Sequence, residues 1–198
     1  MFVHRIVPIV IAALVTAGCG SVGPAPDELY FRLPPVVAAA GERVLTGVLV
    51  VDEFRAGDLH DSRQMLFAKD SAGVVLQQRH YDFWVDRPTK LVADFAQRYL
   101  ESRGVADRVF REAGDINGDW LLGGELRRFE LLSGQGQSVV VGIAFKLSDL
   151  RQRDVLPRSG EVTVEESLND NPSPADVVAA YQRALSKALD QFVQTLTP

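Results

Sequence analysis

The sequence is poor in the residues on which several classes of site depend. Its 198 residues include a single cysteine, Cys19, and three histidines. One cysteine forms no intrachain disulfide, and His60 and His80 are each alone in their segments. The paired ligands of a zinc site and the G-x-S-x-G motif of a serine hydrolase are both missing. We therefore expect neither catalysis, nor a metal, nor a cofactor; a lipoprotein esterase that uses His80 is the minor alternative.

A basic excess is missing as well. The chain has 21 Lys and Arg against 26 Asp and Glu, which gives a net charge of −5 at pH 7. A nucleic-acid partner needs a basic face that neutralises phosphates, and charge-driven binding to anionic lipid has the same requirement. The composition therefore argues against nucleic acid as a partner.

The apolar run at the N-terminus, residues 6–15, is shorter than the roughly 20 residues that span a bilayer. It follows a short basic start and precedes the small pair at residues 17–18, which is the order of an export signal. Cys19 comes next, as in a bacterial lipobox, although Thr16 stands where leucine is usual. We predict a lipoprotein signal peptide over residues 1–18 and a covalent diacylglyceryl and N-acyl lipid on Cys19. An ordinary signal that happens to end at a cysteine is the alternative.

Two segments of different character follow the cysteine. Residues 20–29 are rich in glycine, proline and small residues, which is typical of a flexible tether. Residues 30–35 carry two aromatics and a leucine beside a Pro-Pro pair and predict a short extended piece docked on the domain. We therefore assign the anchor, tether and docked segment to residues 19–43 and one folded domain to residues 44–198.

Within that domain, apolar and alternating runs predict strands. They lie at residues 44–54, 65–67, 74–81, 105–111, 120–132, 139–147 and 154–166. Gly73 lies in the connection between the second and third of these strands, where a glycine can adopt positive φ, and this favours a hairpin. The strands at 120–132 and 139–147 form a second hairpin around the residues 133–136.

Two segments have helical spacing instead. Residues 88–103 have an apolar stripe and end at Gly104, a suitable C-cap. The last helix begins with Ser173 as N-cap and Asp176 placed as the acid of a capping box, and its apolar stripe continues to Leu196. We predict one α+β domain, a mostly antiparallel mixed sheet with two helices packed on one face.

The corner between the third strand and the first helix contains two aromatics and an Asp/Arg pair, in the order Phe-Trp84-Val-Asp-Arg87-Pro. An exposed tryptophan there would be a good anchor for an interface. We take Tyr30, Trp84 and Arg87 as candidate partner-binding residues. The alternative for Trp84 is that it fills the end of the core.

The order of these segments resembles the ABC-type transport auxiliary lipoproteins, the family that includes the paraquat-inducible-operon lipoprotein. The resemblance extends over about residues 19–196 and rests on ordered pieces. These pieces are Cys19, the aromatic-x-Leu-Pro element at 30–35, the strand ending in an aromatic at 48–54, the paired strands closing at 81–84, the stretch 120–130, the strand 139–147 and the C-terminal helix.

The resemblance implies an auxiliary role without catalysis. Members of the family work beside a mammalian-cell-entry-type substrate-binding protein and an ABC permease and ATPase, in lipid traffic between the two membranes of a Gram-negative envelope. Gly20, rather than aspartate, follows the cysteine, and the usual sorting rule then favours the periplasmic face of the outer membrane over the inner membrane. Relatives form rings, so the resemblance also suggests a homo-oligomer. A periplasmic lipid-binding carrier that encloses an acyl chain is the alternative function.

Overall fold

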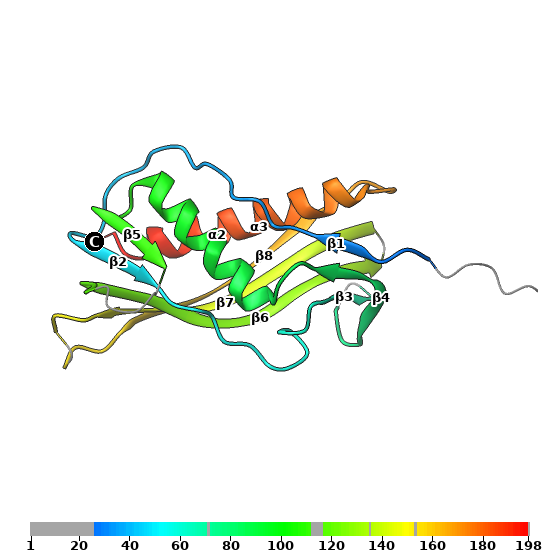
Figure 1. The fold of residues 1–198 in the computed structure, drawn as a ribbon, viewed down its shortest axis with the longest axis horizontal. Coiled ribbons are helices and arrows are strands. Elements are labelled where there is room, and N and C mark those ends of the chain that lie inside the picture. The colour runs from blue at the N-terminus through cyan, green and yellow to red at the C-terminus, as the bar shows by residue number, and fades with distance from the viewer. Residues whose placement is uncertain (1–25, 71, 112–116, 135, 153, 198) are drawn as a thin grey trace, which may run out of the picture.

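The computed structural model describes residues 26–70, 72–111, 117–134, 136–152 and 154–197. The predicted signal peptide and Cys19 lie outside the described residues, so the lipid attachment stays a prediction. Within the described ranges the chain forms two helices and an eight-stranded sheet (Figure 1). The predicted single α+β domain is confirmed. The helices are α2 (Pro88–Arg103) and α3 (Pro174–Gln194). The strands are β1 (Leu29–Phe31), β2 (Val48–Val51), β3 (Gln64–Ala68), β4 (Leu76–Trp84), β5 (Arg108–Arg111), β6 (Trp120–Gly134), β7 (Gly136–Asp149) and β8 (Arg158–Ser167).

The long strand β6 connects all parts of the sheet. It forms an antiparallel hairpin with β7, which continues antiparallel to β8. On its other edge, the start of β6 pairs in parallel with β2 and its end pairs in parallel with β3. β1 and β5 also pair in parallel, with β4 and β2. The extended ladders are therefore antiparallel, as predicted, while the short strands add parallel pairing that the sequence did not indicate.

Three predicted strands are shorter than their apolar runs. Only Val48–Val51 of the run 44–54 is regular strand. At the start of the run, residues 44 and 45 both donate backbone hydrogen bonds to the carbonyl of Val105, at 3.1 and 3.0 Å. That shared acceptor interrupts a ladder, and β5 accordingly begins only at Arg108. β8 begins at Arg158 rather than at residue 154.

Both helices begin where local sequence signals indicate, and α2 also ends there, whereas α3 ends at Gln194, two residues before the end of the predicted stripe at Leu196. Ser173 Oγ accepts a hydrogen bond from the backbone N–H of Asp176 at 3.2 Å, and the Asp176 carboxylate accepts one from the backbone N–H of Ser173 at 2.8 Å. This is the predicted capping box. α2 ends at Gly104, whose φ of 73° is the left-handed conformation that glycine adopts without strain.

The core lies between the helices and one face of the sheet. α3 packs on β7 and β8, and α2 packs on β2 and β5. Aromatic pairs join the layers: Phe145 of β7 stacks on Phe192 of α3 with 4.6 Å between ring centroids, and Phe129 of β6 lies 4.5 Å from Tyr181 of α3. Buried aromatic side chains thus fill the space between the layers.

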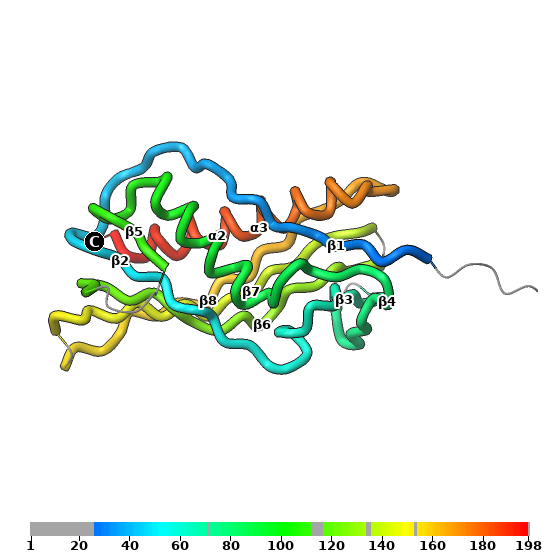
Figure 2. The backbone as a smooth tube through the Cα atoms, viewed as in Figure 1, coloured from blue at the N-terminus to red at the C-terminus, as the bar shows by residue number. Residues whose placement is uncertain are grey.

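Between β1 and β2 the chain crosses the outside of the helices. Residues 32–47 run from β1 along α3 and α2 to the opposite end of the molecule, where β2 begins (Figure 2). The side-chain amide of Gln182 donates to the carbonyl of Pro34 at 2.8 Å, and the backbone N–H of Ala38 donates to Ser102 Oγ at 2.9 Å. Neither described helix is long and apolar enough to cross a membrane.

Candidate functional site

The candidate residues Tyr30, Trp84 and Arg87 belong to one corner of the molecule. β1 pairs in parallel with the end of β4, which sets Tyr30 opposite Phe83 and Phe31 opposite Trp84. The backbone N–H of Val85 donates to the carbonyl of Phe31 at 2.9 Å and extends this pairing into the connection to α2. The docked segment and the β4–α2 corner are therefore held together by main-chain hydrogen bonds.

Trp84 is not an exposed anchor. Only 1% of its surface is exposed, and its ring lies 5.2 Å from that of Phe129 and 5.1 Å from that of Tyr181. Phe31 packs at its edge, with 6.3 Å between centroids. The physical reason is that α3 reaches across the sheet at this point and leaves no route to solvent. The observed role is the alternative given by the sequence, a side chain that fills the end of the core.

Tyr30 is exposed, with 55% of its surface accessible. Its ring stacks on Phe83 with centroids 5.6 Å apart, and the Arg63 guanidinium lies 5.8 Å from the ring centroid. Its hydroxyl donates to Glu28 Oε2 at 2.6 Å. That hydrogen bond, together with the Glu28 charge, raises the pKa of Tyr30. The exposed aromatic is thus held in one orientation, which favours contact with a partner.

Arg87 is half exposed and anchors the start of α2. It is the N-cap residue, and its guanidinium donates to Asp61 Oδ2 at 3.0 Å and to Glu53 Oε1. The buried Thr89 hydroxyl also donates to Asp61, at 2.5 Å. The hydrogen bond and charge of Asp61, with the Glu53 charge, raise the pKa of Arg87. These residues line a cavity of about 360 Å³ between the corner and the segment after β2.

Two buried carboxylates, Glu130 and Glu166, were not among the candidate residues that the sequence indicated. Glu130 of β6 is 1% exposed; Arg128 Nε donates to it at 2.6 Å, the backbone N–H of Phe129 donates at 2.7 Å, and the His60 ring lies 3.7 Å away. Glu166 of β8 is paired with two cations of α3, at 3.0 and 2.5 Å. The alternation of β8 marks Glu166 as inward, but its cationic partners belong to α3. Glu130 has two partners within β6 and a third, His60, from a distant segment, so neither cluster follows from one local pattern.

The described residues contain no constellation suited to catalysis by a histidine or a metal. No group of three or more His, Cys, Asp or Glu that would hold a metal ion occurs among them. His60 faces the buried Glu130, and the exposed His80 lies against Tyr81 with 6.4 Å between ring centroids. What the site offers is an exposed aromatic, an ion-paired arginine and a rigid corner.

Solved structures resemble this fold. Protein XCC0632 from Xanthomonas campestris superimposes with a TM-score of 0.70 at 22% identity, over 85% of this chain and 95% of that one. A second crystal structure, of an uncharacterized protein, gives a TM-score of 0.68 at 13% identity, over 87% of this chain and all of that one. These likenesses concern the fold alone. Comparison with curated proteins gives no match.

A comparison with protein-family models matches residues 31–193, from the end of β1 to the last turn of α3. The match thus includes every helix and every strand after β1 that the structure describes. It agrees with the resemblance carried by the ordered segments of the sequence. The chain belongs to the family of ABC-type transport auxiliary lipoprotein components.

Proposed function

We propose that the protein is a lipid-anchored, periplasmic subunit that assists an ABC-type, mammalian-cell-entry-linked system for lipid transport between membranes, without catalysis of its own. Membership of the auxiliary lipoprotein family over residues 31–193 carries this proposal. The lipobox-like residues before Cys19 support the anchor, since an N-acyl diacylglyceryl group holds a protein stably to a membrane. Gly20 after the cysteine favours the outer membrane.

The start of the described chain supports a domain held close to its membrane. Six residues lie between Cys19 and Pro26, and the seven steps from one to the other reach at most about 25 Å when fully extended. β1 begins three residues later, at Leu29. The exposed Tyr30 and the ion-paired Arg87 would then present a surface near the anchor to the substrate-binding protein, the permease or a second copy of this chain.

Replacement of Cys19 tests the anchor. Cys19→Ala removes the lipid attachment atom, so we expect the protein to move from the membrane fraction to the soluble periplasmic fraction and envelope lipid homeostasis to fail. Gly20→Asp is the matched variant, because it keeps the lipid and alters only the sorting residue; we expect it in the inner membrane. Cys19→Ala protein that stays membrane-bound and active would contradict the proposal.

Cross-linking in envelope membranes tests the partner. Wild-type protein should co-purify with a mammalian-cell-entry-type protein or an ABC permease. Tyr30→Ala and Arg87→Ala should reduce that yield, whereas Arg108→Ala, an exposed cation of β5 outside the corner, should not. Recovery of neither partner with wild-type protein would contradict the assignment to this transport system.

The alternative of a lipid-binding carrier has less support. An acyl chain enclosed between helices and sheet would need space that Phe129, Phe145, Tyr181 and Phe192 occupy. Native mass spectrometry of the Cys19→Ala chain separates the two functions, since a carrier would retain a bound lipid.

A further inference from the structure

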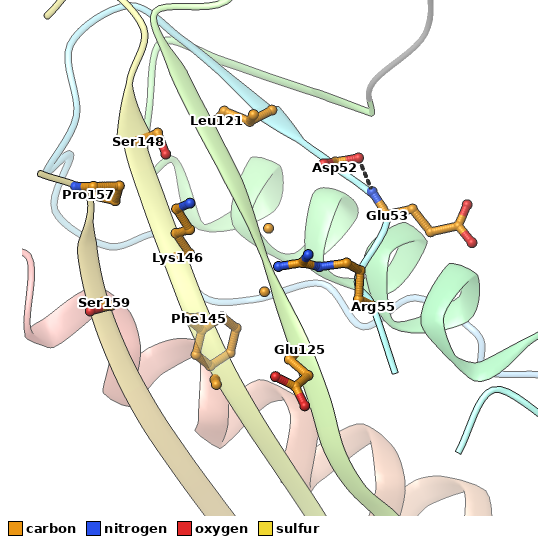
Figure 3. Close-up of a pocket in the computed structure, with 13 residues that line it drawn as sticks. Asp52, Glu53, Arg55, Leu121, Glu125, Phe145, Lys146, Ser148, Pro157 and Ser159 are labelled. Carbon is orange, nitrogen blue, oxygen red and sulfur yellow. Dashed lines mark hydrogen bonds between the residues drawn. The ribbon is translucent and has the colours of Figure 1, made fainter. Parts of the chain in front are cut away.

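A cavity of about 560 Å³ lies on the sheet face that the helices leave uncovered. Its floor is formed by β6, β7 and the start of β8, and its wall by the segment that follows β2 (Figure 3). Successive side chains of a strand alternate between faces, and Phe145 points to the helix side, where it stacks on Phe192. Its neighbours Ala144 and Lys146 therefore belong to the cavity side.

Small residues keep the floor of the cavity open. A Cβ at Gly124 would lie 2.2 Å from the carbonyl oxygen of Ala144, so the sheet itself requires glycine there. Gly123 is different, because a Cβ at this position would meet nothing closer than Asp52, at 3.6 Å. Packing of the strands does not require glycine at 123. Its missing side chain leaves free space directly opposite Lys146, its partner in the β6–β7 register.

Two cations without acidic partners line this space. Neither Arg55 nor Lys146 forms an ion pair with any residue in the described ranges, although both side chains are exposed. The backbone of Arg55 is fixed to β6: its N–H donates to the carbonyl of Gly124 at 2.9 Å, and its carbonyl accepts from Leu126 at 2.7 Å. In Figure 3 the Arg55 guanidinium extends across β6 toward β7, the strand that carries Lys146. Two like charges are thus directed to one cavity.

Two of the three carboxylates that line the cavity, Glu53 and Glu125, are paired with cations. Glu53 is paired with Arg87 of the corner, on the far side of its segment. Glu125 is paired with Arg127 at 3.9 Å, and the same guanidinium lies 3.2 Å from Glu161. In the row that contains Lys146, its neighbours on β6 and β8 are Gly123 and Ser159. The third carboxylate, Asp52, lies on the other side of Gly123, and its Oδ1 accepts a hydrogen bond from the backbone N–H of Glu53 at 2.6 Å. Asp52 forms no ion pair within the described ranges, so the unpaired side chains of the lining are two cations and one carboxylate, and one positive charge is left in excess for a ligand.

We propose that this cavity binds the phosphate group of a phosphate ester. Arg55 and Lys146 contact the phosphate oxygens, and Ser148 and Ser159, which also line the cavity, supply hydroxyl donors. The volume of about 560 Å³ is within the roughly 300–1,000 Å³ of small-molecule sites. A glycerophospholipid headgroup and a soluble phosphate ester offer the same chemistry. The site does not depend on the transport role or on the lipid anchor.

Isothermal titration calorimetry of the full chain carrying Cys19→Ala, at low ionic strength, tests the site with two probes, glycerophosphoethanolamine and inorganic phosphate. We expect Arg55→Gln and Lys146→Gln each to weaken binding about tenfold and the double variant to abolish it, because each loses a charge-assisted hydrogen bond. Gly123→Val should also abolish binding by filling the cavity. Lys69→Gln and Arg108→Gln remove exposed cations elsewhere and should bind like the parent chain.

The proposal would be overturned if the variants of the cavity and the control variants changed the affinity equally. It would also be overturned if the parent chain bound neither probe. Tighter binding of glycerophosphoethanolamine than of inorganic phosphate supports the site and shows that it recognises the headgroup substituents of the ester as well as the phosphate. Equal or tighter binding of inorganic phosphate supports the phosphate site and excludes selection of a headgroup. If Gly123→Val does not fold, as judged by circular dichroism, the two charge variants decide alone. A failed anchor test would leave all of these outcomes unchanged.

Discussion

The two faces of the sheet are stabilised by different interactions. The helix-covered face is aromatic and buried: Trp84, Phe129 and Tyr181 are within 2% of complete burial and contact one another. The opposite face has a small apolar cluster of Ala68, Leu132 and Val140 beside charged side chains and the cavity above β6 and β7. The first face is held by buried area, which sets the fold, while the second is held by charge and leaves room for ligands.

The largest expected effect is on the helix-covered face. Trp84→Ala should lower the free energy of unfolding by about 3–5 kcal/mol, because it empties a fully enclosed site between Phe129 and Tyr181. Urea denaturation monitored by circular dichroism measures it. Tyr30→Ala is the matched aromatic deletion on the exposed side of the same corner and should cost less than about 1 kcal/mol. Equal losses of unfolding free energy in the two variants would mean that burial of the aromatic ring does not determine the cost of its removal.

That contrast was only partly visible in the sequence. The helices, the hairpins and the single α+β domain could be predicted because their signals are local: Gly104 ends α2, and Ser173 and Asp176 cap α3 within four residues. Trp84 has no such local signal. The same pattern of neighbours fits an exposed anchor or a core plug, and the decision comes from Tyr181 on a helix far along the chain.

The parallel strand pairs and the charged clusters could not be predicted from the sequence for the same reason, because their partners are distant in the chain. β2 pairs with β6 only because the chain returns after α2 and β5, and the apolar run at 44–54 contains no information about that partner. The register of β6, β7 and β8 then sets Lys146 beside Gly123. Arg55 reaches the same cavity through hydrogen bonds to β6. The cavity and its two cations thus depend on contacts between segments far apart in the sequence, which local sequence motifs do not predict.

A smaller effect is expected from the buried carboxylate of the open face. Burial raises the pKa of Glu130, but the contacts from His60, Arg128 and the Phe129 N–H outweigh it, and the pKa is lowered overall. The folded pKa is thus below the unfolded value of about 4.3, so the stabilisation is complete above that pH and is lost as pH falls through the folded pKa. Glu130→Gln should cost about 1–3 kcal/mol at pH 7, and the difference from wild type should narrow toward pH 3.

Glu166→Gln is the counterpart on the helix-covered face. Its cationic partners, Arg183 and Lys187, have about half of their side-chain surface exposed, whereas Arg128 beside Glu130 is only 34% exposed. Salt screens exposed pairs more strongly than buried ones. Added NaCl at about 0.5 M should therefore reduce the loss of unfolding free energy caused by Glu166→Gln more than that caused by Glu130→Gln. Urea denaturation with and without the salt measures both losses. If the loss of unfolding free energy caused by Glu130→Gln did not change with pH, the ionised form of the Glu130 carboxylate would not be the source of the stabilisation.

The smallest expected effect concerns the charge balance of the open face. Arg127 neutralises Glu125 and Glu161, and all three side chains are about half exposed. Arg127→Gln should therefore change the free energy of unfolding by less than about 1 kcal/mol. It also releases two carboxylates beside Lys146, and their field should raise the Kd for glycerophosphoethanolamine about twofold to threefold at low salt. Arg43→Gln breaks the exposed pair with Asp107 and is the control for a lost surface cation. An unchanged Kd in the Arg127 variant would mean that Glu125 and Glu161 do not influence the two cations of the cavity. Their pairing with Arg127 would then have no effect on ligand binding at the open face.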